Sequence, residues 1–80
     1  MLRIIDGDKK NLIGKKVREF RLSHNMSQKV LSIKLETMAI YICRGSISRI
    51  ESQTRTVTDI ELFGLSEILK KPISDFFDEN

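Results

Sequence analysis

The 80-residue sequence has little cysteine, proline and histidine, and it has no tryptophan. With a single cysteine, Cys43, the chain cannot form an intramolecular disulfide, as is typical of proteins in the reducing cytosol. Cys43 and the one histidine, His24, are too few for a structural zinc site, which takes about four nitrogen or sulfur ligands. We therefore expect no metal and no disulfide.

Long apolar runs are also missing. The longest one, residues 38–43, has six residues, whereas a helix that spans a bilayer needs about 20. The first ten residues, MLRIIDGDKK, contain no apolar signal core and no cleavage motif. We therefore expect a cytoplasmic protein with no membrane partner.

Groups that carry catalysis are not visible in the sequence. It shows no carboxylate pair, no Ser/His/Asp set and no glycine-rich loop that could hold a phosphate. We therefore predict that the protein is not an enzyme, has no catalytic residues and uses no cofactor.

The charge is distributed unevenly along the chain. Residues 1–55 hold twelve Lys or Arg against five Asp or Glu, a net charge of +7. Residues 56–80 hold two against six, a net charge of −4. Such an asymmetry favours a polyanionic partner on one side of the molecule, although a solvated surface of mixed sign would give the same counts.

Helical periodicity dominates the sequence. Residues 1–11 are predicted to be an N-terminal arm, and residues 12–80 a single domain. Asn11 is a good N-cap for a first helix, whose apolar stripe is Ile13, Val17 and Phe20. Ser27 is predicted to cap a second helix over residues 28–36, with Val30, Leu31 and Leu35 buried.

Residues 37–42 are apolar and ambiguous: a short strand, a helix extension and a packed loop all fit. A third helix is predicted over residues 44–52, with Ile47 and Ile50 inward. Thr58 and Glu61 form a capping box for a fourth helix through about Lys70. Its predicted inward set is Ile60, Leu62 or Phe63, Leu65, Ile68 and Leu69.

Pro72 stops the fourth helix, and a last short helix is predicted to hold Ile73, Phe76 and Phe77. The predicted fold class is all-α: a compact bundle of five helices without a sheet.

Four short motifs in this order resemble the phage-repressor and Cro family of helix-turn-helix domains, also called the XRE family. They are Arg21 in the first helix, the pair Ser27–Gln28, the run Ile-Ser-Arg-Ile-Glu at residues 47–51, and the run Lys-Pro-Ile-Ser-Asp-Phe-Phe at residues 71–77. The resemblance covers about residues 12–77 and implies a lambda-repressor-like bundle.

Two features differ from the family pattern. Glu36 stands where the turn glycine is usual, and about five additional residues, 37–41, precede Ile42. Ser52–Gln53 replaces the usual Asn-Gly after the third helix. A left-handed turn residue is therefore expected to be missing there, so that the helix runs on or ends differently.

The resemblance implies that the helix over residues 44–52 enters the major groove of DNA. Its arginines can bond guanine bidentately, although a solvated helix face would have the same composition. The residues expected at the bases are Arg44, Gly45, Ser46, Ser48 and Arg49. Those expected at phosphates are Ser27, Gln28, Ser52, Gln53, Thr54 and Arg55. Arg21 and Glu51 are expected to form a partly buried structural ion pair.

The resulting hypothesis is a sequence-specific transcriptional regulator, a repressor, that binds double-stranded palindromic DNA as a homodimer. The acidic C-terminal third, including Phe77, is the expected dimer surface. The alternative is a protein-binding module, such as the antitoxin of a toxin–antitoxin pair that represses its own promoter. Cys43, just before the third helix, is either a half-buried small residue or a thiol whose oxidation blocks DNA binding.

Overall fold

The computed structural model describes residues 8–77 and contains only helices in that part of the chain. They are α1 (Gly14–Ser23), α2 (Gln28–Glu36), α3 (Arg44–Glu51), α4 (Asp59–Leu69) and a 3-10 helix, η1 (Ile73–Phe77). The predicted all-α class is confirmed, but the predicted count of five helices needs a correction. The last element is a single short 3-10 segment after Pro72, so four α-helices form the bundle. Most of the predicted arm, residues 1–7, lies outside the described residues.

The predicted capping residues explain where two helices, α2 and α4, begin. Ser27 Oγ accepts a hydrogen bond from Val30 N at 3.0 Å and starts α2 at the predicted position. Thr58 and Glu61 form both bonds of the predicted capping box at the start of α4. α3 starts at Arg44, as predicted, and ends at Glu51, one residue before the predicted end.

α1 begins later than the sequence predicts, because its N-cap residue is Ile13 and not Asn11. Asn11 still serves the start of the helix. Its Oδ1 accepts hydrogen bonds from Ile13 N at 3.1 Å and from Gly14 N at 2.8 Å. The asparagine therefore satisfies N–H groups at the helix start from two residues before the N-cap position.

Of the three possibilities for residues 37–42, the structure shows the packed loop. Ile40 and Ile42 are buried in the core, and Ser32 Oγ donates a hydrogen bond to Ile42 O at 2.6 Å. Ala39 turns the chain with a φ of 60°, which places it in the left-handed region. The longer connection between α2 and α3 therefore contributes to the core.

Each of the four α-helices is followed, at or shortly after its last residue, by a non-glycine residue with left-handed backbone. These residues are Asn25, Ala39, Gln53 and Lys70. After α3, Thr54 N donates to Arg49 O and Gln53 N donates to Ile50 O, the two bonds of a Schellman motif. The prediction that α3 lacks a left-handed turn residue is therefore wrong, because Gln53 adopts that conformation itself.

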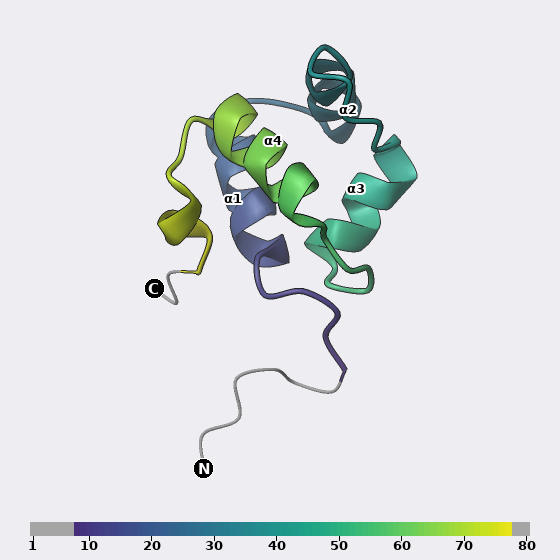
Figure 1. The fold of residues 1–80 in the computed structure, drawn as a ribbon, viewed down its shortest axis with the longest axis vertical. Coiled ribbons are helices and arrows are strands. Elements are labelled where there is room, and N and C mark those ends of the chain that lie inside the picture. Colours follow the sequence, from purple (N-terminus) through teal and green to yellow (C-terminus); the bar gives the residue numbers. More distant parts are fainter. Residues whose placement is uncertain (1–7, 78–80) are drawn as a thin grey trace.

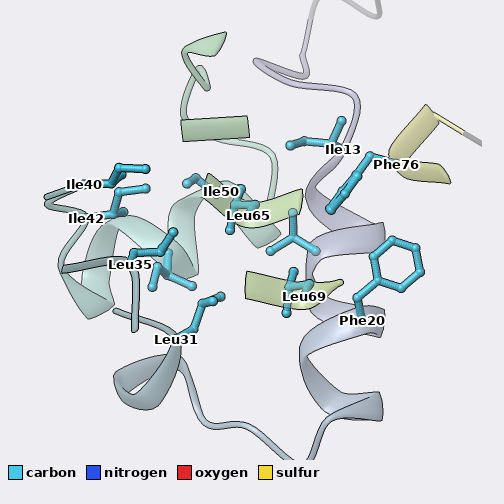
Figure 2. Packing of buried hydrophobic residues seen from close by; sticks show 12 residues of the cluster. Ile13, Phe20, Leu31, Leu35, Ile40, Ile42, Ile50, Leu65, Leu69 and Phe76 are labelled. Atoms are coloured by element: carbon cyan, nitrogen blue, oxygen red, sulfur yellow. The ribbon is translucent and has the colours of Figure 1, made fainter. Parts of the chain in front are cut away.

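Apolar side chains from all five elements, from the α2–α3 loop and from Ile13, just before α1, meet in one core. It consists of Ile13, Val17, Phe20, Leu31, Leu35, Ile40, Ile42, Ile47, Ile50, Leu65, Leu69 and Phe76. Figure 2 shows Phe76 beside Phe20, and their rings meet edge to face with centroids 5.1 Å apart. The η1 segment is thereby fixed against α1.

Several residues predicted to be inward are exposed. They are Val30 on α2, and Ile60 and Phe63 on α4. On η1, Phe76 is buried, whereas Ile73 and Phe77 are exposed. Leu62 and Ile68 are half-buried at the rim of the core. The buried stripes of α2 and α4 are thus narrower than their apolar patterns.

α1 and α4 lie in the middle of the bundle, while α2 and α3 form one side of it (Figure 1). The start of α1 lies very close to the end of α3. A Cβ atom placed on Gly14 would stand 2.1 Å from Ile50 O, so only glycine permits this approach.

Candidate nucleic-acid interface

α3 has one buried and one exposed face. Ile47, Ile50 and Glu51 point inward. Since successive residues turn by about 100°, the other positions of α3 except Ser46 form a single outward stripe together with the C-cap residue Ser52, and all members of the stripe are exposed. They are Arg44, Gly45, Ser48, Arg49 and Ser52. Four of the five predicted base-contacting residues therefore lie together on this stripe.

Ser46, the fifth predicted base-contacting residue, is half-buried at the edge of the stripe. Arg49 Nη2 donates a hydrogen bond to Ser46 Oγ at 3.1 Å, and the Cys43 thiol lies 3.5 Å from the same oxygen. These contacts hold the Arg49 guanidinium along the first turn of α3. Ser46 therefore orients Arg49 and is less accessible to a ligand than its neighbours.

Cys43, the N-cap residue of α3, is exposed, so the expectation of a half-buried residue is wrong. The hydrogen bond with the Ser46 hydroxyl lowers the pKa of the Cys43 thiol, and the backbone N–H groups of Ser46 and Gly45 and the charge of Arg49 act in the same direction. A thiolate is favoured at this position because the free N–H groups of a helix start stabilise an anion.

Gly45 is not required by the fold. Within the described residues no glycine has a positive φ, and a Cβ on Gly45 would meet only Arg49 Nη1, at 3.7 Å. Glycine weakens a helix by up to about 1 kcal/mol relative to alanine. Neither backbone conformation nor packing explains this glycine, whereas close contact of the backbone with a ligand would.

A hydrogen bond between side chains joins the start of α2 to the end of α3. Gln28 Nε2 donates to Glu51 Oε1 at 3.1 Å. The second N–H of the same amide group and the free backbone N–H groups of the first turn of α2 can still donate to an anion. The Ser27 hydroxyl, which was also predicted to contact a phosphate, is exposed and accepts from Val30 N.

Arg21 and Glu51 form the ion pair that the sequence predicts. Both residues are more than nine-tenths buried, with Arg21 Nε 2.6 Å from Glu51 Oε2 and Nη2 3.0 Å from Oε1. Arg21 Nη1 also donates to Met26 O at 2.8 Å. With Gln28, the pair connects α1, the α1–α2 turn, α2 and α3 at one point.

The turn after α3, residues 52–55, differs from the prediction in two of its four side chains. The hydroxyls of Ser52 and Thr54 are exposed and lie 3.0 Å apart. Gln53, however, is 8% exposed, and its Nε2 donates to Asn11 O at 3.1 Å. A buried amide with a partner inside the protein cannot contact a phosphate, so the prediction for Gln53 is corrected to a structural role.

The Arg55 guanidinium also has a hydrogen-bond partner within the protein. It forms two hydrogen bonds with Glu61, Nη1 to Oε1 at 2.9 Å and Nη2 to Oε2 at 2.7 Å. This bidentate pair raises the pKa of Arg55 and, opposed in part by burial, lowers the pKa of Glu61. A phosphate would have to compete with the Glu61 carboxylate for this guanidinium. The pair therefore disfavours the predicted contact of Arg55 with a phosphate.

Two contacts near the candidate interface were missed by the sequence reasoning. Asn11 Nδ2 donates to Ile50 O at 3.1 Å and to Arg55 O at 2.8 Å, connecting the arm to both sides of the α3–α4 turn. His24 is exposed but places Nε2 2.8 Å from Leu69 O. No local pattern reveals either contact, because the partners are 39 to 45 residues apart.

Residues 8–77 contain no group of three or more His, Cys, Asp or Glu side chains arranged to hold a metal ion. No helix in this described range has the length and apolar character that crossing a membrane requires. The chain matches no protein-family model, and none of the curated proteins is significantly similar to it in sequence.

Proposed function

We propose that the protein is a sequence-specific DNA-binding regulator that places α3 in the major groove. The observation that carries the proposal is the exposed stripe of α3, with two guanidinium groups, a hydroxyl and a bare backbone position on one side of a short, well-anchored helix. An α-helix fits the major groove of B-DNA, and arginine can bond guanine O6 and N7 bidentately.

Arg44 and Arg49 differ in the contacts that their side chains make within the protein. Neither forms an ion pair within the described part of the chain, so both charges are available to a polyanion. Arg44 is exposed at the first residue of α3, whereas Arg49 is held by Ser46. We assign Arg44 and Arg49 to base edges, with Ser48 between them, and Gly45 to the closest approach of the backbone.

The start of α2 supplies a backbone contact in the same proposal. Its free N–H groups and the positive end of the helix dipole favour an anion, and the Gln28 amide adds a donor held in place by Glu51. A phosphate there would fix the orientation of α3 without reading sequence. Ser52 and Thr54 offer hydroxyl donors at the other end of α3.

The proposal includes a homodimer, because one short helix reads only a few base pairs and a palindrome doubles the contacts. Four exposed apolar side chains in the C-terminal third could cover one another between two copies: Ile60, Phe63, Ile73 and Phe77. Sedimentation equilibrium with and without an operator duplex measures the stoichiometry. A single copy per palindromic site would remove the homodimer from the proposal.

Selection of bound duplexes from a random DNA pool, followed by affinity measurements over a range of salt concentrations, tests the proposal. Arg44→Ala and Arg49→Ala should relax the preference at particular base pairs, each by about 1–3 kcal/mol. Lys70→Ala, at the far end of α4, removes one positive charge and serves as the matched control. Binding without any sequence preference, or preferences that survive both arginine substitutions, would contradict base readout by α3.

A second candidate is the antitoxin of a toxin–antitoxin pair, which would combine DNA binding with capture of a protein. It is favoured by apolar side chains that the fold leaves in solvent on α2 and on the following loop. Tyr41 is 76% exposed and Ile33 is 51% exposed. Co-expression with the neighbouring genes and co-purification distinguishes it from a regulator that acts alone.

A further inference from the structure

The end of the N-terminal arm is tied to the turn that follows α3. Lys10 N donates to Gln53 O at 2.9 Å, and Gln53 Nε2 donates back to Asn11 O at 3.1 Å. Asn11 Nδ2 adds bonds to Ile50 O and Arg55 O. These four bonds hold residues 10–11 against residues 50–55, which are about 40 residues away in the sequence.

This arrangement places a lysine beside the predicted phosphate-contacting turn. Gln53, whose carbonyl accepts from Lys10 N, is the residue between Ser52 and Thr54, and those two hydroxyls are exposed. Lys10 itself is exposed. A lysine side chain reaches about 6 Å from its Cα, and the Lys10 backbone is bonded to the residue between Ser52 and Thr54, so an anion beside these hydroxyls lies in the region that its ammonium group can serve.

The turn needs a cation from outside if it is to hold a phosphate. Arg55, its own cation, is paired with Glu61, and Gln53 is buried. The turn also follows the C-terminus of α3, where the helix dipole and the last carbonyl groups repel an anion. Hydroxyl groups alone do not offset this, whereas an ammonium group would.

We propose that Lys10, held on the α3–α4 turn by Gln53 and Asn11, contacts the DNA phosphate backbone together with Ser52 and Thr54. Lys9, the exposed residue before Lys10 in the sequence, belongs to the same proposed phosphate-contacting surface. The inference rests on the proposed DNA binding and specifies a part of the interface for which the sequence offered no motif. The contact adds affinity and fixes the position of α3, but it carries no base preference.

The test is a comparison of Lys10→Ala with unmodified protein on the selected duplex and on a random duplex, at several salt concentrations. Lys10→Ala should weaken binding to both duplexes equally, by roughly two- to fivefold, the range of an exposed ion pair. The slope of log K against log salt should fall by about 1, and Lys9→Ala should show the same type of change.

Lys70→Ala is again the matched control, because it removes the same charge at the other end of α4. This eleven-residue helix is about 16 Å long, more than the Debye length of about 10 Å at 0.1 M salt. The control should leave both the affinity and the salt slope unchanged. An equal loss for Lys70→Ala would show an effect of net charge only and would overturn the assignment to Lys10.

Failure of this inference and failure of the proposed function give different results. If Arg44→Ala weakens selective binding while Lys10→Ala changes neither affinity nor slope, DNA binding stands and the Lys10 contact is wrong. If Lys10→Ala lowers the affinity for one duplex only, Lys10 reads bases and the phosphate assignment is wrong. If the unmodified protein binds no DNA, both are rejected.

Discussion

Arg21 and Glu51, 30 residues apart in the sequence, meet in a buried bidentate ion pair that joins α1 to α3. The carboxylate also accepts from Gln28 Nε2, so that one side chain at the end of α3 is bonded to the last turn of α1 and to the start of α2. Glu51 follows directly on the buried Ile50 and belongs to the helix that carries the candidate recognition stripe. The orientation of that stripe therefore depends on this pair.

Glu51→Ala is expected to lower the melting temperature strongly, because the Arg21 guanidinium would remain buried without its counter-charge. Removal of one partner of a buried pair typically costs about 3–5 kcal/mol, a large fraction of the stability of a small domain. Thermal and urea denaturation followed by circular dichroism measure the loss. Glu36→Ala, on the exposed side of α2, is the control and should change little. An unchanged melt for Glu51→Ala would contradict the structural role of the pair.

Gly45→Ala separates folding from DNA binding. The alanine methyl group fits, with Arg49 Nη1 3.7 Å away, and the substitution should stabilise α3 by up to about 1 kcal/mol. The melting temperature should rise by a few degrees. In the proposed complex the methyl group would stand where the backbone approaches the groove, so DNA affinity should fall at the same time. If affinity stays constant while stability rises, Gly45 is not a contact position.

Glu61 predicts an acid-sensitive part of the stability. Its pKa is lowered in the folded state by the hydrogen bonds from Arg55, against an ordinary value of 4.5. A depressed pKa stabilises the fold above the unfolded-state value, and this contribution is lost as the pH falls through the folded-state pKa. Glu61→Gln keeps a capping residue but lacks the charge.

Urea denaturation at pH 7 and at about pH 3 measures this contribution. The variant should be less stable than the unmodified protein at pH 7, and the difference should shrink toward pH 3 as the carboxylate is protonated. A difference of the same size at both values would show that charge is not the cause.

Ala39→Gly should stabilise the protein. Ala39 has a φ of 60°, and a left-handed L-residue costs about 1–2 kcal/mol, which glycine avoids. Part of the gain is lost because glycine makes the unfolded chain more flexible, so the expected net effect is about 0.5–1 kcal/mol. Thr37→Gly, at a right-handed position in the same turn, is the matched control and should destabilise. Equal effects of both substitutions in thermal denaturation would show that backbone strain at Ala39 is negligible.

The helices were predictable because their signals are local. Ser27 reaches Val30 and Thr58 reaches Glu61, each three residues along the chain, so a short stretch of sequence contains both partners. The exposed and buried faces of α3 were predictable for the same reason: two isoleucines three residues apart define the inward side of an eight-residue helix.

The width of a buried face was less predictable. Ile60 on α4 fits the apolar pattern of its helix yet is 66% exposed. Periodicity places the centre of a stripe, but the packing of neighbouring helices determines how much of it is covered. The left-handed residues that follow the helices were also not predictable from the sequence. Ala39, Gln53 and Lys70 are residue types that rarely adopt this conformation and carry no turn signal.

The order of residues was enough to establish the helices and the outward stripe of α3, since both depend on interactions within one helical turn or on a repeat of 3.6 residues. Which polar side chains remain free for a ligand depended on the folded molecule. Gln53 is buried against Asn11, and Lys10 is brought to a turn more than 40 residues away. Such pairings arise from the packing of whole elements, and no local pattern encodes them.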